Sequence, residues 1–387
     1  MKKSYFLPVF GILLLLGACN KKADFNYYYY EPEEYALLSQ YLDLPSLPND
    51  YTVTLPQHLA NAGLFARPVE RDKAVLGRVL FYDKALSKDG KISCASCHKQ
   101  AIGFSDDLAQ SRGVSGQVTD RNSIALASVA NFSAYYGTDL NGPGGIRFFW
   151  DNRAETIAQQ ATGSLTNPKE MNMHMTEVVS AIEVQPYYAT LFKKAYGDNL
   201  VTPDRVTEAI SNFINALGSY QSKFDQEASK EPYGSTFSNF SGFNPSENRG
   251  LKLYENNCSS CHSPIMGRPM LFNASNGLDA VTTADHGVGA ISGTNTEEGT
   301  FKVPTLRNIA LTRPYMHDGR FATMEEVVEH YSSGVQSHPN LHPNLKVNGQ
   351  PKRMNFSATD KQDLIAFLNT LTDEKMKTDE RFADPFK

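Results

Sequence analysis

Two Cys-x-x-Cys-His pentapeptides, one in each half of the chain, carry the residues whose types and spacing most clearly predict chemistry. The thiols of such a motif stand just over one helical turn apart and can each form a thioether with a vinyl group of a porphyrin, while the next residue offers an imidazole to the iron. The motifs use four of the five cysteines. They predict two c-type haems, the first attached at Cys94 and Cys97 with His98 as iron ligand, the second at Cys258 and Cys261 with His262 as iron ligand.

Two other uses of these cysteines account for less of the pattern. Disulfide scaffolds are short and dense in cysteine, whereas this chain has 387 residues and only 5 cysteines. A tetrathiolate zinc site would use both cysteine pairs and leave the two adjacent histidines without a role. Haem attachment explains the cysteines and the histidines together.

The fifth cysteine indicates where the protein works. Two lysines precede an apolar stretch from Tyr5 to Leu16, and small residues lead to Cys19. The pattern predicts a signal peptide over residues 1–18, too short to span a bilayer comfortably, and it resembles a bacterial lipobox with Cys19 as the lipidated residue. The alternative is an ordinary secretory signal with a coincidental cysteine. In both cases we expect export, and the lipobox adds a lipid anchor that holds the protein at a membrane facing the periplasm.

The net charge limits the classes of binding partner, and the positions of the prolines indicate how the chain is divided into segments. The net charge of −5 leaves no excess of basic residues, so nucleic acid is not an expected partner. Residues 19–64 show no helical period and are broken by Pro45, Pro48 and Pro56, which predicts a tether and approach segment. The rest is long enough for about two domains.

Helical periodicity dominates this remainder, so we predict an all-α fold. Two long loops rich in Gly, Asn and Ser, 103–116 and 273–299, are unusual in a compact domain unless they wrap something large, and haem is large enough. We expect two c-type cytochrome domains, 65–232 and 233–387, each with one haem. The predicted helices are 176–196 with an interruption at Pro186, about 203–220, 246–257, 323–331 and 357–371.

The residues that could serve as the sixth iron ligand differ between the two motifs, and this difference predicts different roles for the two irons. A haem iron with two protein ligands is closed, whereas one with a single ligand can bind a substrate. The loop that follows the first motif, 99–121, contains neither His nor Met, so the first iron lacks a local sixth ligand. Near the second motif the candidate ligands are Met316, His317, His330 and Tyr331.

A series of further motifs, in order along the chain, resembles the bacterial di-haem cytochrome c peroxidases and the related MauG-like proteins. The resemblance covers about Leu76 to Leu371. Besides the two CxxCH motifs, it rests on Leu76–Phe81, Leu86–Gly90, Arg121–Ser123, Phe149–Arg153, Asn167–Met171, Val303–Asn308 and Pro314–Gly319.

The resemblance implies three residues that act in catalysis. Glu170 would be the acid/base carboxylate above the open first haem, Gln160 the amide that orients peroxide, and Trp150 the bridge that carries electrons between the haems. Without the resemblance, Glu170 reads equally well as a carboxylate at a helix start, and Trp150 as an ordinary core residue.

The resemblance also implies a calcium ion between the domains, held by the side chain of Asn122 and the carbonyl oxygens of Thr312 and Pro314. Oxygen ligands of this kind suit a hard cation. A turn-forming role is the alternative for Asn122.

The second haem departs from the simple peroxidases of this family. Tyr331 stands where they have a methionine ligand, as in the MauG-like members, and the regulatory His of the first loop is missing. A phenolate favours ferric iron, so a Tyr331-ligated haem would accept electrons less readily than a Met-ligated one. Met316 is the rival ligand.

Three functions compete at this point. The leading one is a peroxidase that reduces hydrogen peroxide to water with electrons from a c-type cytochrome or a quinol-linked donor. The second is a MauG-like oxidase that uses peroxide to modify a partner protein. The third is an electron relay or gas sensor, which would have no need of Glu170 and Gln160. A homodimer is compatible with all three.

Overall fold

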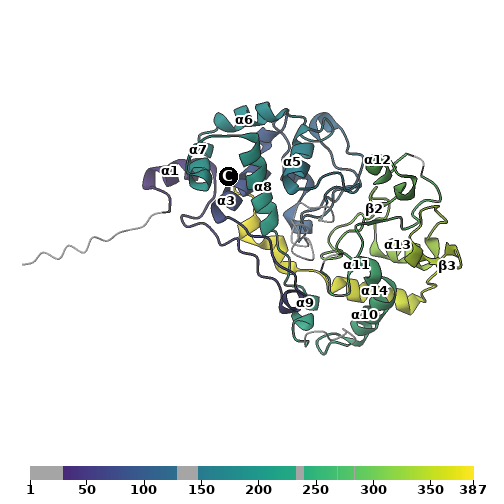
Figure 1. The fold of residues 1–387 in the computed structure, drawn as a ribbon. Coiled ribbons are helices and arrows are strands. Elements are labelled where there is room, and N and C mark those ends of the chain that lie inside the picture. Colours follow the sequence, from purple (N-terminus) through teal and green to yellow (C-terminus); the bar gives the residue numbers. More distant parts are fainter. Residues whose placement is uncertain (1–28, 129–146, 232–238, 268, 283) are drawn as a thin grey trace, which may run out of the picture.

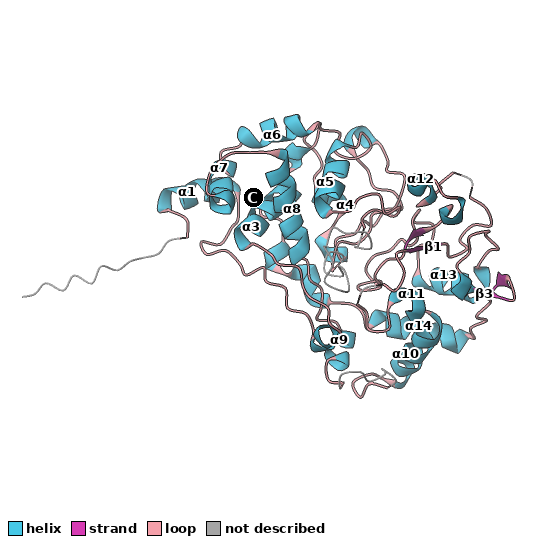
Figure 2. Ribbon diagram, in the orientation of Figure 1, coloured by secondary structure: helices cyan, strands magenta, loops and turns pink. Residues whose placement is uncertain are grey.

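The computed structural model describes residues 29–387 apart from 129–146, 232–238, 268 and 283. The predicted signal peptide and Cys19 lie outside the described residues. The described chain is mostly helical, with two very short antiparallel strand pairs, so the all-α prediction is confirmed (Figure 2). Among the helices of this part, none has the length and apolar character needed to cross a membrane.

The helices are spread over the whole described chain, and the strands are confined to its second half (Figure 1). The α-helices are α1 Pro32–Tyr41, α2 Gln57–Asn61, α3 Arg71–Tyr82, α4 Cys94–Cys97, α5 Ile157–Thr166, α6 Met175–Glu183, α7 Tyr188–Tyr196, α8 Pro203–Ala216, α9 Lys223–Ala228, α10 Pro245–Asn257, α11 Ser259–His262, α12 Gly289–Ser292, α13 Met324–Glu329 and α14 Ala358–Asn369. The strands are β1 Asn273–Ala274 paired with β2 Phe301–Lys302, and β3 Lys346–Val347 paired with β4 Gln350–Pro351.

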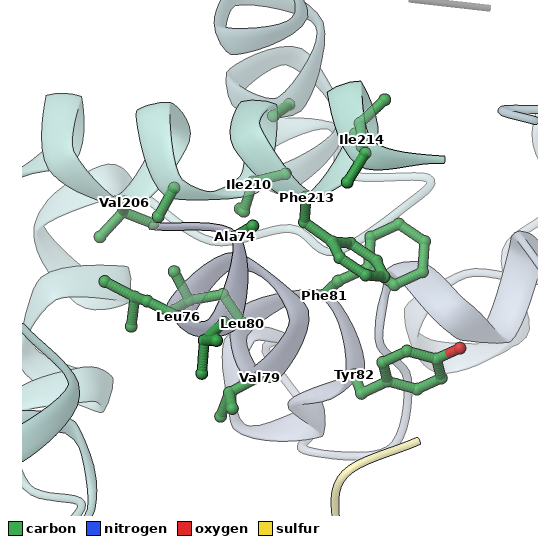
Figure 3. Packing of buried hydrophobic residues seen from close by; sticks show 14 of the residues in the cluster. Ala74, Leu76, Val79, Leu80, Phe81, Tyr82, Val206, Ile210, Phe213 and Ile214 are labelled. Atoms are coloured by element: carbon green, nitrogen blue, oxygen red, sulfur yellow. The ribbon is translucent and has the colours of Figure 1, made fainter. Parts of the chain in front are cut away.

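The larger hydrophobic core is built around α3 and α8 (Figure 3). Apolar residues at three- and four-residue spacing on each helix face the other helix, and the rings of Phe81 and Phe213 lie 5.2 Å apart. Gly77 permits the close approach of the helices, because a Cβ there would lie 1.9 Å from the carbonyl oxygen of Ala209. This core supports the segments that carry the first CxxCH motif.

A second core is built in the same way around α10 and α14. Tyr254 and Phe367 pack with their rings 5.1 Å apart. Gly250 permits the close approach of these two helices, as Gly77 does in the first core, because a Cβ at position 250 would lie 1.9 Å from the carbonyl oxygen of Asp363. The C-terminus of α10 leads directly into the second CxxCH motif.

The helices predicted from the sequence are confirmed, and their caps explain the boundaries. Thr202 caps α8, with Pro203 at its first position, and Thr323 and Ser357 form capping boxes at the starts of α13 and α14. The predicted helix 176–196 is divided into α6 and α7 around Pro186.

The prediction of a non-helical tether is wrong for the described part of residues 19–64. Pro32 stands at the first position of α1, where proline suits a helix, and Glu31 and Glu34 form a capping box. Tyr30 and Leu38 are buried in the first core. Tertiary burial, which local periodicity does not reveal, makes this segment part of the folded body.

The division between the cores also differs from the predicted boundary at residue 232. Phe224 and Ala228 of α9 belong to the second core, and Met376 and Phe382, near the C-terminus, belong to the first. Figure 1 shows the end of the chain returning to the region of α3, where the hydroxyl group of Tyr82 donates a hydrogen bond to the carbonyl oxygen of Phe382 over 2.7 Å.

A buried ion pair ties together the segments between the two cores. The guanidinium group of Arg307 donates two hydrogen bonds of 2.8 Å to Asp225 on α9, and both side chains are only 2% exposed. Arg307 also donates to the carbonyl oxygens of Ser219 and Met266. Burial alone would raise the pKa of Asp225, but the charge and hydrogen bonds of Arg307 outweigh it and lower this pKa.

Candidate active site

The first CxxCH motif forms a single helical turn that faces a cavity. Ser93 caps α4 through a capping box with Ser96, and Cys94, Cys97 and His98 line the cavity. The Nδ1–H group of His98 donates a hydrogen bond to the carbonyl oxygen of Phe104 over 2.9 Å. Burial lowers the pKa of His98, so the imidazole is neutral and its Nε2 lone pair is available to a metal.

The second motif repeats this arrangement in another cavity. Cys258, Cys261 and His262 line it, and the Nδ1–H group of His262 donates to the carbonyl oxygen of Pro304 over 3.0 Å. Within the described chain, no cluster of three or more His, Cys, Asp or Glu side chains could hold a metal ion, and the two cysteine pairs line different cavities. A shared tetrathiolate zinc site is therefore excluded, whereas the residues fit two covalently attached haems.

Burial also controls the state of the thiols before attachment. It raises the pKa of both Cys94 and Cys258 to about 12. The sulfur atoms are therefore neutral thiols and not thiolates at neutral pH. Buried neutral thiols are poor ligands for a free cation.

The structure brings Glu170 and Gln160 into the first cavity with the CxxCH residues. Gln160 lies on α5, and its Nε2 donates to the hydroxyl oxygen of Ser164 over 3.0 Å. Glu170 follows α5, and its Oε1 accepts a 2.8 Å hydrogen bond from Nδ2 of Asn167. One carboxylate oxygen is thus fixed by a neutral amide while the group lines the cavity.

Gly113 was not predicted as a site residue, yet it fixes the position of Glu170. A Cβ at this position would lie 2.0 Å from the carbonyl oxygen of Lys169 and 2.9 Å from Cα of Glu170. The neighbouring Val114 donates its backbone N–H to the carbonyl oxygen of Glu170 over 3.0 Å. The loop after the first motif can therefore support the carboxylate only because residue 113 has no side chain.

The first cavity contains a methionine sulfur that the sequence did not predict there. Met171, next to Glu170, lines the cavity and is 4% exposed. Met171 is distant in sequence from the loop 99–121, which follows the first motif and contains neither His nor Met. The other residues in the lining are Phe81, Ile92, Ser93, Ser111, Gly113, Thr119, Ser123, Leu126, Ala161, Ser164, Leu165, Ile210 and Ile214.

Three of the four candidate ligands for the second haem line the second cavity: Tyr331, Met316 and His317. The ring of His317 stacks on Phe301 with centroids 3.6 Å apart. His330 lines a different hollow instead, and its Nε2 lies 3.1 Å from the carbonyl oxygen of Asn276. The structure therefore separates His330 from the other candidates.

Tyr331 and Met316 both contact Asn276. The Nδ2 atom of Asn276 donates to the sulfur of Met316 over 3.5 Å, and the same side chain hydrogen-bonds Tyr331. Tyr331 lies in a π-helical turn, His330–Gly334, which extends α13. Such turns are frequent at functional sites. Burial raises the pKa of Tyr331 to about 12.

Trp150 connects the two halves of the site. Its Nε1–H donates to the carbonyl oxygen of Asn122 over 2.8 Å, and its own carbonyl oxygen accepts the backbone N–H of Lys302 on β2 over 2.7 Å. Trp150 lines the second cavity, while Ser123, next to Asn122, lines both cavities. The indole is thus fixed where the two cavities adjoin.

Arg121 holds the Trp150 loop in place, a role that the sequence did not predict. Its Nη1 donates to Asp151 over 2.6 Å, and its Nε and Nη2 donate to the two carboxylate oxygens of Asp285 over 2.7 and 2.6 Å. Burial lowers the pKa of Arg121, but the hydrogen bonds to Asp285 and Asp151 outweigh it and raise this pKa. The guanidinium group of Arg121 therefore joins its own loop to the loops that carry Asp151 and Asp285.

Lys302 is a second unpredicted cation beside the second cavity, which it lines. Its Nζ donates to the carbonyl oxygen of Arg147 over 2.7 Å, and burial lowers its pKa to about 8. A cation in a mainly apolar cavity fits the anionic carboxylates at the edge of a haem.

Asn122, Thr312 and Pro314, the predicted calcium ligands, also line the second cavity. Nδ2 of Asn122 donates to the carbonyl oxygens of Leu108 and Ala109, at 3.1 and 3.3 Å. Because these bonds use the amide nitrogen, the amide oxygen is the atom that would face a cation.

Comparison with known proteins agrees with this geometry. The family model of di-haem cytochrome c peroxidase matches residues 71–232. The methylamine utilization protein MauG of Methylorubrum extorquens is 32% identical over 312 residues, which cover 80% of each chain. The cytochrome c551 peroxidase of Nitrosomonas europaea is 32% identical over 314 residues, which cover 80% of this chain and 82% of that one.

A solved structure shows the same fold along nearly the whole chain. A MauG-like protein associated with microbial copper homeostasis is 30% identical, with a TM-score of 0.67, over 89% of this chain and 98% of the other. The chain therefore belongs to the di-haem cytochrome c peroxidase family, oxidoreductases that act on peroxide and carry two c-type haems.

Proposed function

We propose that this protein reduces hydrogen peroxide to water at the first haem site, with electrons that a c-type cytochrome or a similar donor delivers through the second. The convergence of Glu170 and Gln160 with His98 in one cavity carries this proposal. An electron relay would not need an acid and an amide beside an open iron. When bound, each haem supplies an iron that changes oxidation state.

Glu170 would move the protons of the reaction. Its carboxylate would take a proton from one oxygen of the peroxide held in the first cavity and return it to the other oxygen, which leaves as water. Two electrons from the donor and two protons from solvent would convert the remaining oxygen to the second water. Asn167 holds Oε1, so Oε2 is the atom that exchanges the proton. The amide of Gln160 would orient the peroxide, and Gly113 and Val114 would keep the carboxylate in place.

At the second site we propose Tyr331 as the sixth ligand of the iron that His262 binds. The π-helical turn places Tyr331 in the lining of the same cavity as His262. Met316 lines this cavity too and is the rival ligand, and the side chain of Asn276 hydrogen-bonds both Met316 and Tyr331. A tyrosine ligand favours ferric iron, which would suit a donor of low potential.

The electron path would run through Trp150. In Trp150→Phe, oxidation of the reduced second haem by peroxide should slow roughly tenfold or more, because phenylalanine lacks the indole N–H and is far harder to oxidise. Stopped-flow absorbance of the holo-protein with a reduced cytochrome donor measures this step and tests the peroxidase function itself. Phe149→Leu, on the same loop but outside the second cavity, is the control and should behave as the wild type. Equal rates in Trp150→Phe and wild type would contradict the bridging role.

Three further proposals concern the surroundings of the site. A calcium ion would be held by Asn122, Thr312 and Pro314, which supply oxygen ligands in the lining of the second cavity. Cys19 would carry a lipid that anchors the protein to a membrane on the periplasmic side. The first haem would belong to an N-terminal domain and the second to a C-terminal one.

Oxidation of a partner protein is a second candidate function. Tyr331 favours it, since this residue would stabilise oxidised states of the second haem, and one relative of similar length is a MauG. Under this alternative, the spectrum produced by peroxide would persist for minutes without a donor. An immediate return to the resting spectrum would exclude it.

A further inference from the structure

Asp83 is a buried carboxylate outside the active site that binds two tyrosines. It follows the last residue of α3 and is 4% exposed. Its Oδ2 accepts hydrogen bonds from the hydroxyl groups of Tyr188, over 2.7 Å, and Tyr187, over 3.0 Å. Its Oδ1 accepts the backbone N–H of Ala85 over 2.8 Å. All three donors are neutral, which is unusual for a buried carboxylate.

The two tyrosines continue a row of aromatic rings toward the surface. The rings of Tyr187 and Tyr188 have centroids 4.7 Å apart, and those of Tyr187 and Tyr41 lie 5.6 Å apart. Tyr188 is 1% exposed and Tyr187 is 4% exposed, whereas Tyr41 on α1 is 40% exposed. The row therefore begins in the first core and ends at solvent.

The inner end of the row lies near the first haem site. Phe81, two positions before Asp83 on α3, lines the first cavity, and α3 packs against both α4, which begins at Cys94, and α7, which begins at Tyr188. Burial raises the pKa of Tyr188 well above its usual value, and the negative charge of Asp83 adds to the rise. Cys94 is a predicted attachment point of the first haem and lines the first cavity. Tyr188 thus stays protonated and donates its hydroxyl hydrogen to a buried carboxylate at the end of the helix that borders the first cavity.

We propose that Tyr188, Tyr187 and Tyr41 form a relay that carries oxidising equivalents from the first haem site to the surface, with Asp83 as the shared proton acceptor. The relay rests on the proposed function, because hydrogen peroxide is the oxidant that loads the first site. Its outlet at Tyr41 would oxidise small phenols, which are one-electron reductants.

Each step balances in electrons and protons. Tyr188 gives one electron to the oxidised site and its phenolic proton to Oδ2 of Asp83, which leaves a neutral tyrosyl radical. Tyr187 then gives an electron to this radical; Asp83 returns the proton to Tyr188 and takes the one from Tyr187, since both phenols share Oδ2. Finally Tyr41 reduces Tyr187, Asp83 returns that proton, and Tyr41 releases its own proton to water.

A structural role is the alternative, in which the phenols only fasten α7 to the end of α3. The two readings differ in chemistry that does not depend on turnover. We would mix the holo-protein with hydrogen peroxide, without an electron donor, in the presence of a nitroso spin trap, and locate the adduct by peptide mass spectrometry. The relay predicts an adduct on Tyr41 of the wild type.

Conservative variants distinguish the relay from a purely structural role of the tyrosines. Tyr188→Phe and Tyr187→Phe each keep the ring but remove the proton, and the Tyr41 adduct should be lost in both. Tyr196→Phe, also on α7, is the matched control, because its hydroxyl group donates to a backbone carbonyl, that of Arg205, and it should keep the adduct. If one variant fails to retain haem, the other still gives the answer.

Three results would overturn the relay, and they can be told apart. Absence of the Tyr41 adduct in a wild type that consumes peroxide with a reduced cytochrome would contradict the relay alone. An undiminished Tyr41 adduct in the phenylalanine variants, while the wild type consumes peroxide with a reduced cytochrome, would contradict the relay alone. Absence of any reaction between wild type and peroxide would contradict the proposed function together with the relay.

Discussion

Replacement of Glu170 by Gln is expected to lower donor-supported peroxide reduction by a factor of about 10² to 10⁴, the usual contribution of a positioned acid or base. Glutamine can still accept the hydrogen bond from Asn167 at Oε1, so the local structure should persist. It cannot take a proton from peroxide. The rate of peroxide consumption, measured with saturating reduced cytochrome, gives the size of the effect.

The matched control for this variant is Glu177→Gln. Glu177 is a carboxylate seven positions further along, paired with Lys88 at the surface. Haem absorbance should be the same in both variants, which separates loss of chemistry from loss of cofactor. Full activity in Glu170→Gln with normal haem content would show that another group transfers the protons.

Replacement of Asp225 by Asn is expected to destabilise the protein by about 3–5 kcal/mol, because it leaves the charge of Arg307 buried without its partner. Such a loss is a large part of the stability of an ordinary domain. The pKa of Asp225 is lowered in the folded state, so its contribution is present at neutral pH and is lost as the pH falls through that lowered pKa. Urea unfolding of the holo-protein at pH 7 and at acid pH measures both effects.

Asp198→Asn is the control for the stability measurement. Asp198 pairs with Arg205 at the surface, where solvent screens the charges, and its removal should leave the unfolding midpoint unchanged. If both variants unfold at the same urea concentration, the pair between Arg307 and Asp225 does not stabilise the junction between the cores.

The sequence was sufficient for features whose cause is local. The spacing of the CxxCH motifs, the capping boxes at Thr323 and Ser357 and the break at Pro186 each act within a few residues, and the structure has the corresponding turns and helix ends. The family motifs also indicated Glu170, Gln160 and Trp150 as site residues, and all three line the cavities.

Features that depend on contacts between distant segments could not be predicted. Gly113 matters because the backbone of Glu170 passes close to it, and Arg121 because it binds carboxylates 30 and 164 positions away. Leu38 of α1 is buried in the first core, and this burial cannot be predicted from the local sequence. Pro45, Pro48 and Pro56 therefore led to the wrong prediction that the whole segment is a non-helical tether. None of these contacts leaves a periodic signal in the chain.

We propose that the two haems differ, with the first open beneath Glu170 and the second closed by Tyr331. The EPR spectrum of the oxidised holo-protein tests it most directly. We predict one high-spin ferric haem and one low-spin ferric haem, with the low-spin signal changed in Tyr331→Phe and the high-spin signal retained. Two low-spin haems would contradict the claim, and Met171 would then be the first ligand to examine at the closed first site.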